Sequence, residues 1–132
     1  MLAPPAAGPS GLDSPVVAVR ASHLLCKHTE SRNPVSRRTN EQTTMSREEA
    51  EKEMAKWVAA LEKDDREMAE KFAALAYHRS DCGSFQQGGD LGHFGHGEMQ
   101  SQFEEATWNT PVGEVSAPFH SDSGCHIVYR TK

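Results

Sequence analysis

Cys82 carries the most reactive side chain in the middle of the chain, within RSDCGSFQQGGDLGHFG, residues 79–95. A cysteine acts as a nucleophile when a base lies beside it and an oxyanion hole faces it. The chain offers histidines as candidate bases, but sequence spacing does not place any of them near the thiol. The common alternative for a free cysteine is a small buried thiol.

The glycines that follow Cys82 are compatible with three kinds of site. A phosphate-binding loop requires GxxxxGK[ST] ahead of a helix, and that motif is absent. His93 and His96 have HxxH spacing, but no clear helix carries them and no acidic residue completes a ligand set. No metal or cofactor is therefore predicted, and the wall of a binding pocket is the third possibility.

The formal net charge of −5 argues against general nucleic-acid binding. Residues 27–38 are a local exception, with one carboxylate and four cations: Lys27, Arg32, Arg37 and Arg38. Such a basic loop on an acidic protein is either an anion site or a solvated surface.

Composition narrows the class of protein further. Three cysteines without a CxxC pair predict neither a disulfide framework nor a zinc knuckle, and they favour a reducing compartment. No run of 18 apolar residues is present, so no membrane-spanning segment is predicted. A chain of 132 residues is long enough for one domain with one core.

The element that positions His23 is a predicted strand over residues 16–26. Its alternation places five side chains on one face: Val17, Val19, Ala21, His23 and Leu25. Lys27 continues the same parity beyond the strand. Residues 1–15 contain four prolines and two glycines and little to bury, which predicts a disordered tail before a domain over 16–132.

Two helices are predicted after the basic loop. Ser46 and Glu49 form a capping box for the first. Its apolar stripe consists of Ala50, Met54, Trp57, Val58 and Leu61. Asp64 or Asp65 is expected to cap the second. Its stripe consists of Met68, Phe72, Leu75 and Ala76.

The second half of the chain predicts a short strand over 90–94 and a short helix over 100–108 with Phe103 and Ala106 facing inward. Strands over 114–120 and 125–130 follow, joined by the SDSG turn. The first and last strands are the longest and most apolar, so placing them in the middle of a four-stranded sheet buries the most surface. Helices on the faces of that sheet make an α+β domain.

Four motifs together carry a family resemblance: SHLLCKH at 22–28, GGDLGHF at 88–94, MQSQFEEA at 99–106 and PVGEVSAPFHSDSGCHIVYR at 111–130. In this order and spacing they resemble the parvulin-type peptidyl-prolyl cis/trans isomerases, over residues 17–132. DCGS with GGDLG, and the basic loop after SHLLCKH, resemble the branch directed at phosphoserine- or phosphothreonine-proline. No stretch resembles the WW domain that often accompanies that branch.

The resemblance implies a four-stranded antiparallel sheet surrounded by about four helices, and it assigns roles to site residues. His23 and His126 are expected to hydrogen-bond to one another beneath the site, which also includes Cys82. Gln100 and Ser123 match polar residues of the site. The residues expected to receive the substrate proline ring are Leu91, Met99 and Phe103.

Lys27 and Arg32 match positions of the phosphate-binding loop. The branch usually has two adjacent arginines there, whereas Arg32 is followed by the uncharged Asn33. Arg37 or Arg38 is the candidate replacement.

The predicted function is a monomeric isomerase that acts on proline-directed phosphoproteins in the cytoplasm or nucleus. It would stabilise the twisted amide without covalent attack, with Cys82 facing the rotating carbonyl. The glycine stretch would wall the pocket and let the backbone approach the substrate. Two alternatives remain: a foldase of the same fold that is indifferent to phosphate, and a non-catalytic module that binds proline-containing peptides.

Overall fold

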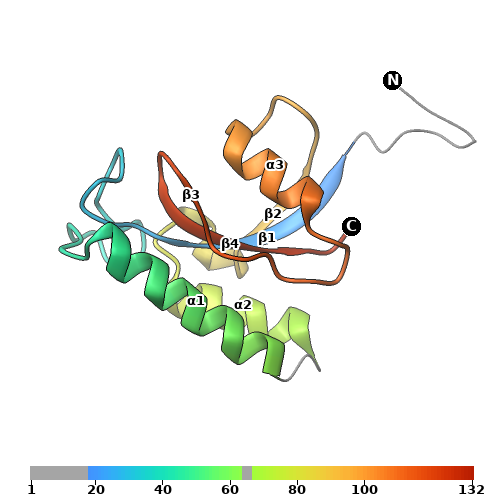
Figure 1. Cartoon of the computed structure of the whole chain (residues 1–132), viewed down its shortest axis with the longest axis horizontal. Helices are drawn as coiled ribbons and strands as arrows, with labels where there is room; N and C mark the ends of the chain where they lie inside the picture. Colours follow the sequence, from blue (N-terminus) through green and yellow to red (C-terminus); the bar gives the residue numbers. More distant parts are fainter. Residues whose placement is uncertain (1–17, 64–66) are drawn as a thin grey trace, which may run out of the picture.

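The computed structural model describes residues 18–63 and 67–132. It contains four strands, β1 (Val19–Cys26), β2 (Asp90–Phe94), β3 (Phe119–Ser121) and β4 (Gly124–Arg130). They form one antiparallel sheet in the order β2-β1-β4-β3 (Figure 1). The predicted α+β class and the central position of the first and last strands are confirmed.

Helices cover both faces of this sheet. Figure 1 shows α1 (Arg47–Lys63) and α2 (Met68–Arg79) below the sheet and α3 (Ser101–Asn109) above it. A 3-10 helix, η1 (Gly83–Gln87), precedes β2. The described residues therefore contain three α-helices and one 3-10 helix, where the resemblance implied about four helices.

Alternation along β1 and β4 supplies one apolar cluster to each face. Beneath the sheet, Leu24, Cys26 and Ile127 pack against α1 and α2. Above it, Ala21 and Val128 pack with Phe94 and Phe103, among others. Because both faces of the central strands are covered, the backbone that carries His23 and His126 is held from two sides.

The predicted start of α1 is confirmed. The Ser46 hydroxyl accepts from the Glu49 N–H at 3.1 Å, and the Glu49 carboxylate accepts from the Ser46 N–H at 2.8 Å. At α2, Asp64 and Asp65 lie outside the described residues, as does the predicted tail. The N-cap of α2 is Glu67, in the left-handed conformation and without a side-chain capping bond, so the predicted aspartate cap is wrong.

The predicted strand over 114–120 is largely wrong. Val115 forms a single bridge to Tyr129, and the Ser116 hydroxyl accepts the Val128 N–H at 3.0 Å. Regular pairing begins only at Phe119, because Pro118 has no N–H to donate. In α3, Phe103 points inward as predicted, but its fully buried companion is Thr107, one turn later, while Ala106 is half-buried.

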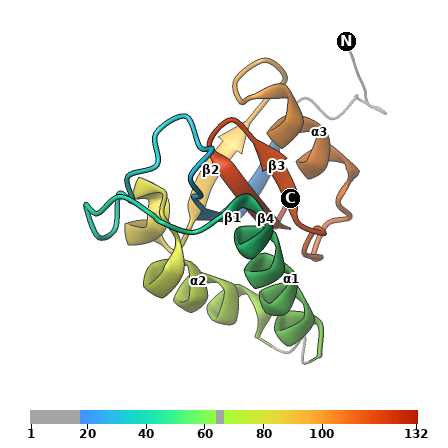
Figure 2. The same cartoon turned by 60° about the vertical axis from the view of Figure 1, so that its left-hand side comes forward.

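The loop between β1 and α1 comes to the same end of the sheet as the turn between β3 and β4 (Figure 2). The Arg32 N–H donates to the Asp122 carbonyl at 2.8 Å, and the Arg37 N–H donates to the Asp81 carbonyl at 2.9 Å. These bonds bring the basic loop, the β3–β4 turn and the segment before η1 together. None of the helices in the described part of the chain is long and apolar enough to cross a membrane.

Candidate active site

Two histidines meet across the central strands. His23 on β1 and His126 on β4 are both buried, and their Nδ1 atoms lie 3.3 Å apart. The Nε2 atom of His23 lies 3.1 Å from the Ser84 hydroxyl, and the Nε2 atom of His126 lies 2.6 Å from the Ser121 hydroxyl. A hydrogen-bonded chain thus runs from serine to serine through both rings. Burial, and then the neighbouring His23, lower the pKa of His126 well below its usual value, so this ring stays neutral near pH 7.

Cys82 lies at the His23 end of this chain, as the N-cap of η1. Burial by itself raises the pKa of its thiol. The hydrogen bond and charge of His23, together with bonds from the Ser84 hydroxyl and N–H, outweigh burial and lower the pKa from 9.0 to about 6. Cys82 is therefore mainly a thiolate at neutral pH. Burial has the opposite result at Cys26 and Cys125, where it raises the pKa to about 12.

An apolar pocket of about 190 Å³ lies above the histidines. It is lined by His23, Cys82, Leu91, Met99, Gln100, Phe103, Ser121, Ser123 and His126. The Phe103 ring stands edge-on to both imidazoles, with ring centroids 5.3 Å apart in each case. The residues expected to surround a proline ring, Leu91, Met99 and Phe103, thus line one pocket.

A second pocket of about 330 Å³ adjoins the first, because Cys82 and Ser123 line both. It also contains three cations, Lys27, Arg32 and Arg37. None of the described residues that line it is an aspartate or glutamate, and its negative group is the Cys82 thiolate. Burial, and then repulsion from Arg37, lower the pKa of Lys27, which indicates that the two cations lie close together.

The cations of this pocket differ in how they are held. The Lys27 ammonium donates to the Val35 carbonyl at 2.6 Å, and Arg32 pairs with Asp122 at 2.9 Å. The Arg37 guanidinium makes no ion pair with any residue that the structure describes. Of the two candidates to accompany Arg32, Arg37 lies in the pocket. Arg38 lies outside it and donates to the Ser80 carbonyl at 3.3 Å.

Comparison with known proteins matches residues 23–132 to the PPIC-type PPIase domain, a rotamase. The chain belongs to this family of peptidyl-prolyl isomerases. It is 46% identical over 114 residues to peptidyl-prolyl cis-trans isomerase ESS1 of Saccharomyces cerevisiae, a match that spans 86% of this chain and 65% of the yeast protein. It is 42% identical over 113 residues to Pin1 of Malus domestica, which spans 86% of this chain and 93% of the apple protein.

A solved structure of ESS1 from Candida albicans agrees with the fold. It superposes with a TM-score of 0.78 at 38% identity and covers 89% of this chain and 67% of that one. The predicted parvulin family and fold are therefore confirmed, and the chain is a peptidyl-prolyl cis-trans isomerase domain of the Pin1 and ESS1 type. Among the described residues, no cluster of histidine, cysteine and carboxylate side chains could hold a metal ion.

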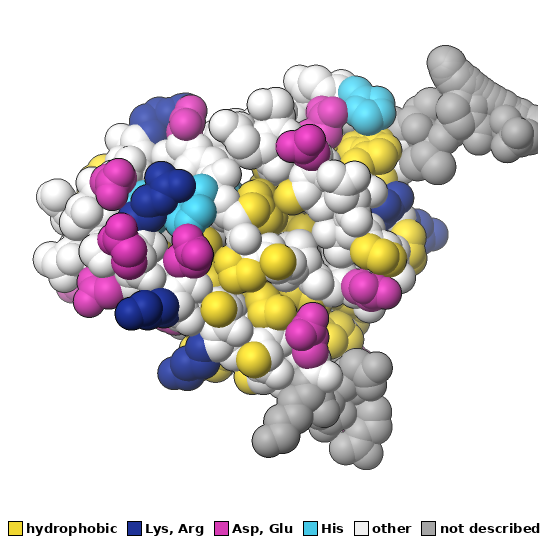
Figure 3. All heavy atoms as spheres, viewed as in Figure 1, with side chains coloured by type: hydrophobic (Ala, Val, Ile, Leu, Met, Phe, Trp, Pro, Cys, Tyr) yellow, Lys and Arg dark blue, Asp and Glu magenta, His cyan; other side chains and the backbone are white. Residues whose placement is uncertain are grey.

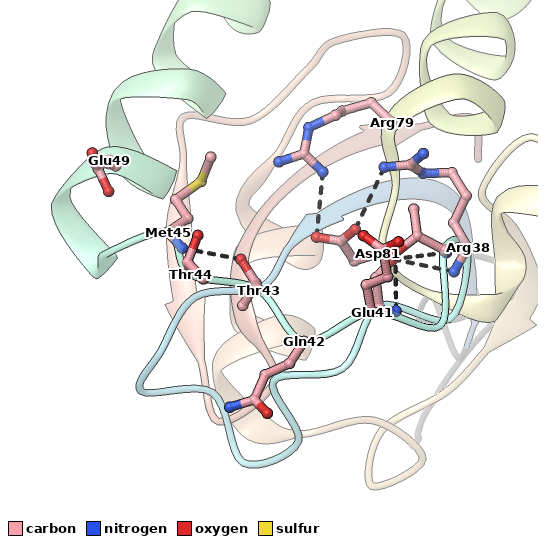
Figure 4. A pocket seen from close by; sticks show the side chains of 11 residues that line it. Arg38, Glu41, Gln42, Thr43, Thr44, Met45, Glu49, Arg79 and Asp81 are labelled. Atoms are coloured by element: carbon pink, nitrogen blue, oxygen red, sulfur yellow. Dashed lines mark hydrogen bonds and ion pairs between the residues drawn. The ribbon is translucent and has the colours of Figure 1, made fainter.

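Asp81 is a residue of the isomerase whose importance the sequence analysis missed. Its buried carboxylate accepts the Lys27 N–H at 2.9 Å, and its own N–H donates to the Leu25 carbonyl at 2.8 Å. Figure 4 shows Arg38 and Arg79 converging on the same carboxylate from two sides of a polar cleft of about 540 Å³. Asp81 therefore ties Cys82, its neighbour in sequence, to the end of β1 and to the basic loop.

The glycines of the isomerase serve a different contact from the one predicted. Gly89, with φ +82°, accepts the His23 N–H at 2.9 Å, and a Cβ there would lie 2.2 Å from the His23 carbonyl oxygen. Gly88, with φ +65°, lies against Ala73 of α2 in the same way. These glycines approach β1 and α2 rather than a substrate. Among the described glycines, only Gly83 lines either of the two adjoining pockets, and the predicted glycine wall is largely replaced by Cys82, Ser84 and Leu91.

Ser84 and Ser121 complete the histidine chain but were not identified from the sequence. A signal exists for Ser121, because it shares strand parity with Ser123 and is the first residue of the SDSG turn. Nothing comparable marks Ser84, whose place depends on the 3-10 turn that follows Cys82.

Proposed function

We propose that this isomerase acts on phosphoserine- and phosphothreonine-proline bonds. The observation that carries the proposal is the shared wall of the two pockets. Cys82 and Ser123 separate an apolar pocket fit for a proline ring from a cationic pocket fit for a phosphate. In a phosphoserine-proline dipeptide these two groups are on adjacent residues, so one substrate can occupy both pockets.

Rotation about the prolyl bond needs no bond to break. Its barrier of about 18–20 kcal/mol arises from amide resonance, which the twisted transition state has lost. A catalyst must bind this twisted form better than either planar isomer. The apolar pocket grips the ring, the cations hold the phosphate, and the peptide unit between them turns. The dry floor of Phe103, Leu91 and Met99 favours the less polar twisted amide.

The electrostatics of the site support a non-covalent role for Cys82. A thiolate beside the rotating carbonyl disfavours the resonance form that places negative charge on the carbonyl oxygen, so it weakens the partial double bond that resists rotation. Covalent attack would add a tetrahedral adduct that the torsion does not require. His23 and His126 act on the thiolate through the hydrogen-bonded chain, and the buried, neutral His126 fixes the ring of His23.

A phosphate suits the cationic pocket because it carries nearly two negative charges at pH 7 and three strong acceptor oxygens. Charge-assisted hydrogen bonds contribute about 1.5–3 kcal/mol each, less where the groups are exposed. Lys27 is buried and its ammonium donates to the Val35 carbonyl, whereas Arg37 is exposed. We expect a preference for phosphorylated peptides that falls as salt rises.

One observation favours a second candidate, a foldase that is indifferent to phosphate. Arg32 already has a carboxylate partner in Asp122, and Asn33 has no charge. Phosphate would then meet only Lys27 and Arg37 as unopposed cations.

The first candidate implies that the partners are proline-directed phosphoproteins of the cytoplasm or nucleus.

Adjacent arginines provide a matched test. We expect Arg37→Ala to lower the ratio of kcat/KM for a phosphoSer-Pro peptide to kcat/KM for its Ser-Pro counterpart by about fivefold. Arg38→Ala removes the same charge from a side chain outside the pocket, so the ratio should change little. Equal ratios in the two variants would show that the cationic pocket does not read phosphate.

A further inference from the structure

Asp122 stands at the rim of the cationic pocket, on the turn between β3 and β4. Its carboxylate accepts from the Arg32 guanidinium at 2.9 Å, and its carbonyl accepts the Arg32 N–H at 2.8 Å. The backbone hydrogen bond fixes the position of the Arg32 main chain. The side-chain ion pair is two-thirds exposed, so Arg32 can exchange this partner for another. Arg32 is the one cation among the described residues of this pocket that pairs with a carboxylate.

The turn that carries Asp122 is tied to the proline pocket. The Asp122 N–H donates to the Gln100 side-chain oxygen at 3.3 Å, and the Gln100 amide donates to the Ser123 hydroxyl at 3.3 Å. The Ser123 N–H in turn donates to the Ser121 hydroxyl at 3.1 Å, next to His126. The backbone of Asp122 is therefore held in place by groups that line the other pocket.

We propose that Asp122 is a specificity-determining residue that acts through Arg32, as an internal counter-ion that a substrate phosphate must displace. This inference rests on the proposed function, because it concerns the same phosphate. A dianion that recruits Arg32 either breaks the Arg32–Asp122 pair or comes to lie near a second negative charge. Both outcomes cost binding free energy that an unphosphorylated peptide does not lose.

The consequence is a brake on phosphate affinity. Lys27 and Arg37 attract the phosphate without direct opposition from Asp122. Arg32 contributes only the difference between its interaction with phosphate and its existing interaction with Asp122. Exposed ion pairs are weak, so Asp122 should lower phosphate affinity a few-fold rather than by orders of magnitude. It also gives the phosphate a competitor that speeds its release after turnover.

Asp122→Asn tests this proposal because it keeps the shape and removes the charge. We expect the variant to lower KM for a phosphoSer-Pro peptide about three- to fivefold at low salt. We expect kcat not to rise, and the Ser-Pro peptide to show no matching change. Glu70→Gln, an exposed change on α2 beneath the sheet, controls for net charge. Asp122→Glu keeps the negative charge, so its KM should stay near the wild-type value.

The double variant Arg32→Ala/Asp122→Asn separates action through Arg32 from direct repulsion. If Asp122 acts through Arg32, its removal from the Arg32→Ala protein should give little further gain. A full gain in the double variant, or a higher KM in Asp122→Asn alone, would overturn the proposal.

The proposed function can fail separately from this inference. A wild-type protein that turns over both peptides equally would contradict the phosphate preference. In that case the role of Asp122 is tested with inorganic phosphate alone. Phosphate is titrated into the wild type and into Asp122→Asn, and binding is followed by the NMR signals of the arginine side chains. Tighter phosphate binding by Asp122→Asn than by wild type would still support it, and unchanged or weaker binding would overturn it.

Discussion

At Cys82, neighbouring residues determine the ionisation of a thiol that burial alone would keep protonated. The same burial raises the pKa of Cys26 and Cys125 to about 12, where no imidazole is bonded to the thiol. At Cys82, His23 and Ser84 reverse the effect and bring the pKa to about 6. A thiolate beside the proline pocket is thus a product of the serine–histidine chain rather than of the cysteine itself.

The ionisation of Cys82 gives a prediction with a clean readout. The ultraviolet absorbance of thiolate should rise with a midpoint near pH 6, because the other two thiols stay protonated until about pH 12. Since folding lowers this pKa from 9.0, the thiolate adds stability that is complete above about pH 9 and is lost as the pH falls through 6. A Cys82→Ser protein should lack the signal. A midpoint near 9 would show that His23 does not polarise the thiol.

Substitution of Cys82 tests whether its charge or its nucleophilicity matters. Cys82→Asp keeps a negative group at the site, so it should retain more activity than Cys82→Ala or Cys82→Ser. The measurement is kcat/KM on one phosphoSer-Pro peptide for all three variants. An aspartate variant as inactive as the alanine variant, or a covalent enzyme–peptide adduct seen by mass spectrometry, would instead indicate thiol attack.

At the scale of elements, the site depends on how closely the turn before β2 approaches β1. The backbone of Gly89 lies against the His23 carbonyl at a positive φ that only glycine adopts easily. The turn therefore sets the position of His23 by contact with its backbone, and η1 sets the position of Cys82.

A matched pair of glycine variants measures that contact. Gly89→Ala places a methyl group against the His23 carbonyl, whereas Gly92→Ala meets nothing within 4 Å at a similar φ of +71°. Both should lose about 1 kcal/mol of stability through backbone strain. Gly89→Ala should lose roughly 2 kcal/mol more and also lower kcat, because β1 must move. Denaturant unfolding and peptide turnover provide the two readouts, and equal losses would argue against the contact.

Elements with strong periodicity were predictable from the sequence, and those shaped by single tertiary bonds were not. The stripe and capping box of α1 fixed its start correctly, and the alternation of β1 and β4 placed them at the centre. The expectation of a strand over 114–120 rests on the SDSG turn, which would join it in a hairpin to 125–130. Pro118 and the side-chain bond from Ser116 interrupt the ladder, and neither effect is visible in periodicity.

Across the whole molecule, the candidate site combines side chains from five separate segments, and its two halves differ in how well sequence predicts them. The apolar half is what the family resemblance implies, and Leu91, Met99 and Phe103 line one pocket. The charged half depends on the path of the basic loop, which has no periodicity. Sequence could not tell Arg37 from Arg38, or show that Asp122 pairs with Arg32.

The arrangement of the molecule keeps these halves side by side. Figure 3 shows charged side chains of both signs gathered over the end with the basic loop, and hydrophobic atoms between α1 and α3. Within the site, Asp81 joins the basic loop to β1 and Asp122 joins it to the β3–β4 turn. The central claim is that this frame holds phosphate and proline of one substrate in adjoining pockets.

Exchange NMR on matched Ser-Pro and phosphoSer-Pro peptides, with catalytic amounts of protein at low salt, tests that claim most directly. It records the cis/trans interconversion itself, so it reports activity and phosphate preference together. The account predicts cis/trans exchange far faster than the uncatalysed isomerisation, which takes tens of seconds or longer. It also predicts that kcat/KM is about tenfold or more higher for the phosphorylated peptide. Equal acceleration of the two peptides would contradict the phosphate claim, and no acceleration of either would contradict the account of the site.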